Sequence, residues 1–357
     1  MFFDRTEQNP GARLLFILAC LAVVVHGLRV AAPILLPATL ALFLAVLSLP
    51  VMLWLTRRRV PAGLATVVTV LLNVAVVGLI ILLASSSVSE LQANLDGYAR
   101  NLLERQTQLF TWMERTTNLE ITDYITTDLI DPGAIVDVAR GALGQIAQFV
   151  SLTFLVFLIM AFMLGEATVF PMKFRYLLGP EAGSDDRLAK VVTEVQTYLG
   201  IKTMVSLATG LILGLWAFAM GLDFPVLLGL IAFILNYVPT VGSIIAAIPA
   251  VLLSLILHGT VGHAVVVAAG YVTVNTLFGN ILEPNLMGRR LGLSTLVVIL
   301  SLLFWGWAWG PLGALLSVPL TVIVKIWLEN TQDLRWVAIL LDKKAPSDPS
   351  AEPPVPI

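Results

Sequence analysis

Residues 224–258 read FPVLLGLIAFILNYVPTVGSIIAAIPAVLLSLILH, and this stretch decides the fold class. It is apolar almost throughout, yet it is too long for one helical crossing of a membrane, which needs about 20 residues. Its middle, NYVPTVG at residues 236–242, contains a proline and a glycine, which interrupt helices. We therefore predict two helical arms joined by a break, a feature tolerated inside a membrane only where protein or water surrounds it.

The composition of the whole chain also indicates an integral membrane protein. Of its 357 residues, 58% are hydrophobic and 12% are charged, and the mean hydropathy is +0.92. A typical soluble domain has about 25% charged residues, so this chain cannot form a water-facing surface of normal polarity. The net charge of -2 excludes nucleic acid as a main partner, because phosphate binding needs a concentrated basic face.

The sequence carries no pattern typical of a metal site, a cofactor site or an enzyme. Cys20 is the only cysteine, the three histidines have no HExxH spacing, and no GxxxxGK[ST] phosphate loop occurs. No pair of nucleophile and base is visible. We expect no enzymatic activity, no cofactor and no bound metal.

Further apolar runs predict the remaining membrane segments. A second over-long run, residues 293–328, is interrupted at WGWAWGPLG, residues 305–313. The runs of single-span length are 14–32, 34–55, 62–84, 146–164, 203–222 and 262–282. These runs predict an all-α polytopic membrane protein of about eight membrane segments, including two broken helical hairpins, with a helical insertion outside the cytoplasm.

Basic residues predict the orientation, because Lys and Arg concentrate in cytoplasmic loops. The densest cluster, residues 57–59, lies between the second and third spans, which places the N-terminus in the cytoplasm. Lys343 and Lys344 place the C-terminal tail there too. Counting the spans between these loops, residues 224–258 enter and leave on the outer side and residues 293–328 on the inner side.

The chain divides into five predicted parts. The extracytoplasmic part, residues 85–145, has apolar residues at 3,4 spacing. This spacing predicts a helical hairpin that assembles protomers or gates access, or else a helix face packed on its own membrane domain. The parts are three N-terminal transmembrane helices (1–84), the extracytoplasmic amphipathic segment (85–145), a fourth transmembrane helix with a cytoplasmic amphipathic helix (146–202), a core of two transmembrane helices and two opposed hairpins (203–328), and a cytoplasmic tail with a disordered end (329–357).

The two broken runs look like an inverted repeat, because each follows one span and each break precedes a small, apolar stretch ending in proline. These stretches are GSIIAAIP at residues 242–249 and GALLSVP at residues 313–319. Broken helices in corresponding positions indicate the binding site of a transporter. Asparagines near such breaks are candidates to bind solute, and for each of them the alternative role is a hydrogen bond between helices. The predicted solute pathway contains Asn236, Tyr237, Pro239, Thr240, Gly242, Asn275, Asn280, Gly310 and Gly313.

Asp223 and Glu283 are the only acidic residues in the predicted core, 203–328. A carboxylate near hydrocarbon is costly unless it is paired, hydrated or protonated, so both are candidates for ion coupling. For Asp223, the alternative is a solvated helix end at the outer boundary. For Glu283, the alternative is an ion pair with Arg289 or Arg290 at the inner interface.

Residues 236–250 (NYVPTVGSIIAAIPA) and 279–325 (GNILEPNLMGRRLGLSTLVVILSLLFWGWAWGPLGALLSVPLTVIVK) resemble the signatures of the autoinducer-2 exporter family of bacterial membrane proteins. The resemblance implies an inner-membrane protein that exports a small signalling molecule and forms homo-oligomers, pentamers in that family. Asn285 and Arg290 depart from the nearest branch, where a basic residue and a glycine stand. Since both lie beside Glu283, ion dependence is not carried over.

We weigh three functions. The leading hypothesis is a secondary exporter, in the lipid bilayer, of a small polar solute such as the quorum-sensing signal autoinducer-2. The main alternative is a sodium or lithium/proton antiporter, since some members of the family resemble such antiporters. The third is a structural or regulatory membrane protein whose outer helices bind a partner.

Overall fold

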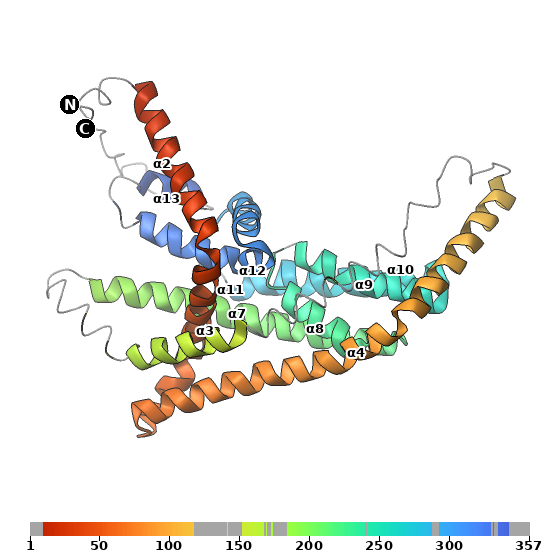
Figure 1. Cartoon of the computed structure of the whole chain (residues 1–357), viewed down its shortest axis with the longest axis horizontal. Coiled ribbons are helices and arrows are strands. Elements are labelled where there is room, and N and C mark those ends of the chain that lie inside the picture. Colours follow the sequence, from red (N-terminus) through yellow and green to blue (C-terminus); the bar gives the residue numbers. More distant parts are fainter. Residues whose placement is uncertain are drawn as a thin grey trace.

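The computed structural model of the chain describes residues 10–117, 141, 152–167, 169, 173, 184–239, 241–287, 293–329, 331 and 335–342 (Figure 1). Over these residues the chain is helical, without a strand, and a single isolated bridge joins Leu293 to Asp342. Six of the described helices are long and apolar enough to cross a membrane. The prediction of an all-α polytopic membrane protein is thereby confirmed. The second outer helix, the loop around Arg289 and the tail end lie outside the described residues.

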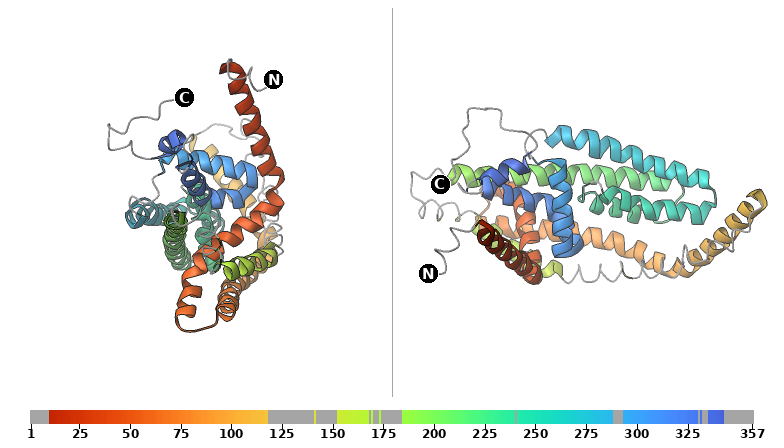
Figure 2. Two further views of the ribbon diagram at one scale, coloured as in Figure 1. Left: turned by 90° about the vertical axis from the view of Figure 1, so that its left-hand side faces the viewer. Right: turned by 90° about the horizontal axis from the view of Figure 1, so that it is seen from above.

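Three helices form the N-terminal part: α2 (Pro10–Val30), α3 (Ala32–Arg57) and α4 (Ala62–Thr117). The first two apolar runs are separated at Ala31, which caps α3, and Pro33 lies in the first turn of that helix. Helix α4 does not end near residue 84, where the sequence suggested a boundary, but continues to Thr117 and is 56 residues long in all. Residues 85–117 contain no proline and many good helix formers, so nothing interrupts the helix as it leaves its apolar span. Its far part extends beyond the neighbouring helices (Figures 1 and 2).

Helix α7 (Ser184–Ala219) joins two segments that the sequence treated separately, the amphipathic stretch up to residue 202 and the span that follows. No proline occurs between these points, and the helix runs through without interruption. The part long and apolar enough to cross a membrane is Val192–Ala219. Lys202 therefore lies inside this membrane segment rather than on a surface helix.

The first predicted break separates α8 (Pro225–Leu235) from α9 (Val241–His258), which fold back on each other and share one apolar cluster. In the turn, the Val238 amide donates to the Leu235 carbonyl at 2.9 Å, and the Gly242 amide donates to the Val238 carbonyl at 3.2 Å. A Cβ atom on Gly242 would overlap the Leu235 carbonyl oxygen. The glycine at this position therefore lets α9 begin directly against the end of α8.

The second predicted break lies within α12 (Thr295–Glu329), where Gly310 has φ 69° and ψ -154°, a conformation that other residues rarely adopt. The arms on either side fold back on each other, because the Ser301 hydroxyl donates to the Ser317 carbonyl at 2.8 Å. A Cβ atom on Gly313 would overlap the Trp305 carbonyl oxygen. At both breaks, therefore, a glycine lies directly against a backbone carbonyl of the preceding arm. The side of the membrane from which each arm pair enters stays a prediction.

The helix between the two breaks is not uniform. It begins as α10 (Val261–Asn275), continues as the π-helix η3 (Thr276–Leu282) and ends as α11 (Glu283–Met287). π-Helical segments are rare, and they frequently occur at functional sites. A short helix, α13 (Arg335–Leu341), then packs against α12.

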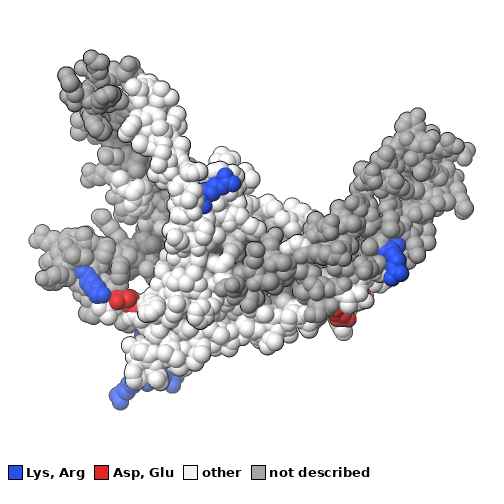
Figure 3. Space-filling view, in the orientation of Figure 1, with Lys and Arg blue, Asp and Glu red and all other residues white. Residues whose placement is uncertain are grey.

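Apolar side chains form three clusters, and α7 belongs to two of them. The first cluster joins α3, α7 and α12. The second joins the four helices α7, α8, α9 and α10, and the third joins α3, α4 and the helix Leu152–Glu166. The outer surface is uncharged over wide areas of the described helices (Figure 3), as contact with lipid requires. Helix α7 is the element that connects the two breaks.

Helices α7 and α8 approach closely at glycines. A Cβ atom on Gly229 of α8 would lie 2.7 Å from the Gly210 carbonyl oxygen and 3.1 Å from the Gly214 Cα atom. Gly210 and Gly214 form a GxxxG pattern, which typically allows two membrane helices to pack closely, and here it is a close packing face.

We expect Gly229→Ala to lower the free energy of unfolding by about 1–3 kcal/mol, because the added methyl group meets backbone on both sides. Thermal unfolding in detergent measures the effect. Gly78→Ala is the matched control, since a Cβ atom there meets nothing within 4 Å. Equal unfolding temperatures for the two variants would contradict the close packing of α7 and α8.

Candidate functional site

A line of polar side chains is buried on one face of α7. Lys202 and Thr209 are each 3% exposed, and Ser206 is fully buried. Their spacing of four and three residues places them on one face of the helix. All three lie within the apolar segment Val192–Ala219. They are therefore polar residues inside a membrane helix, where such groups are functional candidates.

An ion pair stands at one end of this line. Lys202 Nζ lies 2.7 Å and 2.8 Å from the two carboxylate oxygens of Glu283, which begins α11 directly after the π-helix. The Glu283 side chain is 16% exposed. The sequence had offered Arg289 or Arg290 as its partner; the structure provides Lys202, and the two arginines lie outside the described residues. Pairing cancels both charges, which is what makes them tolerable away from water.

The break between α8 and α9 packs on the same stretch of α7. The Asn236 side-chain amide donates to Ser206 Oγ at 3.0 Å, and the Tyr237 hydroxyl donates to Thr203 Oγ1 at 2.7 Å. Asn236 is 7% exposed. Two of the predicted pathway residues therefore lie within one helical turn of the ion pair on α7. We call Lys202, Thr203, Ser206, Asn236, Tyr237 and Glu283 the polar cluster.

Other predicted pathway residues lie at the edge of this cluster or away from it. Pro239 and Gly242 shape the turn beside Asn236, and the Pro239 carbonyl accepts the Val241 amide at 2.6 Å. Asn275 is half-buried and Asn280 is exposed. Among the described residues no hydrogen bond joins either asparagine to the cluster. Thr240 lies outside the described residues.

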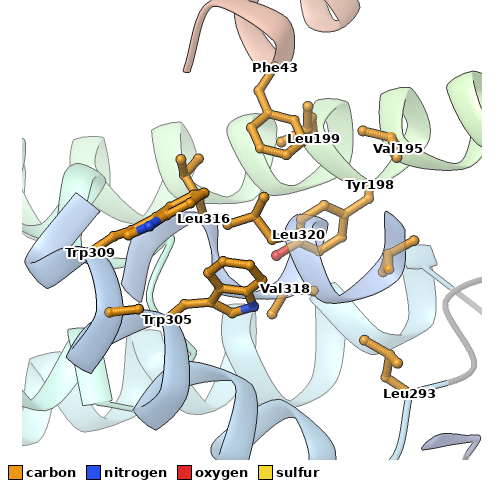
Figure 4. Packing of buried hydrophobic residues seen from close by; sticks show 12 residues of the cluster. Phe43, Val195, Tyr198, Leu199, Leu293, Trp305, Trp309, Leu316, Val318 and Leu320 are labelled. Atoms are coloured by element: carbon orange, nitrogen blue, oxygen red, sulfur yellow. The ribbon is translucent and has the colours of Figure 1, made fainter. Parts of the chain in front are cut away.

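The second break meets α7 one turn earlier. Trp305 and Trp309, on the arm that ends at Gly310, pack with Tyr198 and Leu199 of α7 in one buried cluster (Figure 4). Both tryptophans are core residues and are only 7% exposed. Gly310 and Gly313 shape this break without touching the polar cluster in any hydrogen bond that the described residues show.

Asp223 lies at the other end of α7, in the connection to α8. The Tyr98 hydroxyl of α4 donates to its Oδ2 atom at 2.8 Å, and Tyr98 also meets Phe224 edge to face at 6.3 Å. An open depression of about 430 Å³ adjoins this contact, with Glu90 on its wall. Asp223 is thus a hydrogen-bonded helix-end residue, far from Glu283. Tyr98 and Leu91 pack on the membrane helices, while the role of the outer segment as a whole stays a prediction.

A sequence model described as AI-2E family transporter matches residues 14–333. The chain belongs to this transporter family. It is 40% identical over 335 residues to "AI-2 transport protein TqsA" of Escherichia coli, covering 93% of this chain and 96% of that protein. It is 36% identical over 342 residues to "Putative transport protein YhhT" of the same organism, covering 95% and 97%. A "Putative transport protein" of Borreliella burgdorferi is 29% identical, covering 90% and 89%. The expectations of a membrane transporter and of no enzymatic activity are confirmed.

In this AI-2E transporter, sequence reasoning missed half of the polar cluster. Lys202, Thr203 and Ser206 lie at the boundary between the predicted part that ends with a cytoplasmic amphipathic helix (146–202) and the predicted core (203–328), so Lys202 was not considered a membrane residue. The signal that would have found them is the helical spacing of Lys202, Ser206 and Thr209 within a run lacking proline. That spacing places one cation on a buried helix face, which requires an anion nearby.

We expect Lys202→Met to lower the free energy of unfolding by about 3–5 kcal/mol, because Glu283 is left as an unpaired charge. The double variant Lys202→Met with Glu283→Gln should regain most of that loss. Thermal unfolding of both measures the coupling between the two residues. Lys173→Met is the control: its pair with Glu166 is similarly short, at 2.9 Å, but both side chains are 59% exposed, so a loss of about 0–1 kcal/mol is expected. A double variant no more stable than Lys202→Met would contradict the pairing.

The Tyr98–Asp223 contact predicts a pH dependence. Burial, followed by the hydrogen bond to Asp223, raises the pKa of the Tyr98 hydroxyl above its ordinary value of 10.0. A raised folded-state pKa contributes stability that is fully present below the unfolded-state value and is lost as the pH rises above it. The stability difference between the wild-type chain and Tyr98→Phe should therefore stay constant from about pH 6 to 9 and shrink above about pH 10. A difference that shrinks below pH 9 would contradict this assignment.

Proposed function

We propose that this AI-2E transporter is a secondary exporter of a small, polar, uncharged signalling molecule such as autoinducer-2. The observation that carries the proposal is the polar cluster, which brings an ion pair of zero net charge together with the hydrogen-bonding groups of the α8–α9 break. Its groups donate and accept hydrogen bonds without adding charge. The name of the E. coli relative, an AI-2 transport protein at 40% identity, supports the same class of solute.

Neutrality of the cluster favours an uncharged solute. A charged solute inside the membrane needs an opposite charge that is free to receive it, whereas Lys202 and Glu283 already neutralise each other at 2.7 Å. An uncharged solute needs only donors and acceptors in place of its hydration shell. Asn236, Tyr237 and the backbone groups of the turn supply such partners.

The two breaks give a route for alternating access. In the proposed orientation, both termini lie in the cytoplasm of a bacterial inner membrane, the α8–α9 pair enters from outside and the arms of α12 enter from inside. Both breaks meet α7 on neighbouring turns, at Tyr198 and at Thr203. Movement of either break relative to α7 exposes the cluster to one side at a time. We expect the exporter to work as a homo-oligomer, the pentamer that the family resemblance implies.

The alternative function is sodium or lithium/proton antiport. One observation favours it: Glu283 is a carboxylate inside a membrane segment and retains 16% exposure. In this case a cation displaces Lys202 Nζ from the carboxylate, and protons compete for the same site. Asp223, hydrogen-bonded to Tyr98 at the far end of α7, is the weaker candidate for coupling.

Efflux from proteoliposomes tests the proposal and separates it from antiport. Liposomes that contain the wild-type chain should release preloaded autoinducer-2 faster than equally loaded liposomes without protein, called empty liposomes below. Tyr237→Phe should slow this release at least about tenfold, the effect of losing a hydrogen bond worth more than 1.4 kcal/mol. The double variant Lys202→Met with Glu283→Gln should keep most of the release, because the variant is neutral like the original pair.

The antiporter predicts the opposite pattern: sodium-driven proton movement in the wild type, its loss in the double variant, and no autoinducer-2 release above that of empty liposomes. Glu166→Gln serves as the control for loss of a carboxylate, since Glu166 forms an exposed pair. Autoinducer-2 release that never exceeds that of empty liposomes, under any imposed ion gradient, would remove the export proposal.

A further inference from the structure

Helices α7 and α10–α11 lie side by side and antiparallel along most of their length. At one end, Lys202 contacts Glu283. At the other end, the Trp216 indole packs so closely on Gly270 that a Cβ atom there would overlap it. Thr209 stands midway between Lys202 and Trp216, and the π-helix begins at Thr276, near the middle of the facing segment. This interface leads from the polar cluster toward the α7–α8 connection, over about 21 Å at 1.5 Å per residue.

Three buried polar atoms near this interface have no hydrogen-bond partner among the described residues: Thr209 Oγ1, Trp216 Nε1 and the Tyr271 hydroxyl. Thr209 and Tyr271 are each only 3% exposed. A buried polar group left without a partner costs about 1–3 kcal/mol, and most such groups in proteins bind a partner or ordered water. Three of them on two facing helices indicate that a group other than the described residues satisfies them.

The Thr209 hydroxyl is the most informative of the three. A threonine within a helix usually donates to the carbonyl four residues earlier, and Thr69, Thr203 and Thr273 of this chain all do so, at 2.8, 2.7 and 2.7 Å. Thr209 makes no such bond. Its hydroxyl remains available on the face that carries Lys202 and Ser206.

We propose that Thr209, Trp216 and Tyr271 form a second binding station for the transported solute, on the outward side of the Lys202–Glu283 pair. This inference rests on the proposed export function and adds the route by which the solute leaves. The station has hydrogen-bonding groups and no formal charge: α7 from Thr203 to Ala219 contains no charged residue, and neither does the facing segment from Gly270 to Leu282. It therefore suits a small, polar, uncharged solute and its accompanying water, and not an ion.

Apolar residues surround the station. Leu213, Ala217 and Val267 are all buried in the same cluster as Tyr271. With apolar walls and few polar groups, the station has the usual make-up of a small-molecule site, in which a small number of hydrogen bonds orient the ligand. Its three groups lie on helices rather than on a turn, so their spacing does not change when the α8–α9 break moves.

Removal of the unpartnered hydroxyls tests the station. Thr209→Val and Tyr271→Phe should slow autoinducer-2 release from proteoliposomes at least tenfold, while the unfolding temperature stays the same or rises, because neither hydroxyl binds protein in the described structure. Thr69→Val is the matched control. Thr69 is fully buried and donates to the Ala65 carbonyl, so this variant should unfold at a lower temperature and keep its release rate. Full release by both Thr209→Val and Tyr271→Phe would overturn the inference.

Cysteine labelling tests the station without relying on transport. Cys20 is the only cysteine of the chain, so Cys20→Ser provides a background for Thr209→Cys. A small, water-soluble methanethiosulfonate reagent should modify Thr209→Cys in the full chain, and autoinducer-2 should slow the reaction. Thr69→Cys, equally buried but in the cluster of α3 and α4, should stay unmodified. No reaction at Thr209→Cys would overturn the inference.

The failures of the two proposals are distinguishable. If the wild-type chain releases autoinducer-2 but Thr209→Cys does not react and both hydroxyl variants release at full rate, the second station is wrong and export stands. If the wild-type chain releases no autoinducer-2 but Thr209→Cys reacts, the proposed substrate is wrong, and the reaction still supports a hydrated path along α7.

Discussion

The ion pair between Lys202 and Glu283 is the interaction on which the rest of this structure depends. Two opposite charges inside membrane segments are stable only together, because each alone lacks the water that would solvate it. Their contact at 2.7 Å holds α7 against α11 and thereby brings the π-helix and α10 alongside α7. It also creates a place inside the membrane domain that is polar but has no net charge. The hydrogen-bonding residues of the α8–α9 break then pack on the same part of α7.

Helix breaks within a membrane domain carry a related constraint, because backbone groups released from a helix need partners that lipid does not offer. Both breaks of this chain meet α7. The first is covered by polar contacts from Asn236 and Tyr237, and the second by Trp305 and Trp309 packed on Tyr198 and Leu199 (Figure 4). The contacts of the two breaks with α7 therefore differ in chemistry: hydrogen bonds join the first break to α7, whereas aromatic and aliphatic side chains pack at the second.

Several features of the fold could be predicted from the sequence because they depend on neighbouring residues. The two breaks, the apolar spans and the GxxxG face all follow from local hydropathy or from proline and glycine. The composition of the polar cluster could be predicted only in part. Asn236, Tyr237 and Glu283 were recognised as unusual residues in apolar surroundings, but Asn275 and Asn280, chosen by the same rule, have no hydrogen bond to the cluster. A polar residue in an apolar run indicates that some partner exists without indicating which face of the helix it occupies.

The sequence by itself determined that this is a helical membrane transporter, where its helices are interrupted, and that Glu283 needs an explanation. Only the tertiary structure decided that Lys202 pairs with Glu283 from 81 positions away and that α4 and α7 continue past their predicted boundaries. It also decided that Thr209 and Tyr271 are buried without a hydrogen-bond partner among the described residues. The physical reason is one of range. Hydropathy and backbone propensity act between residues close in the chain, whereas an ion pair or an unfilled hydrogen bond depends on which helices become neighbours when the membrane domain packs.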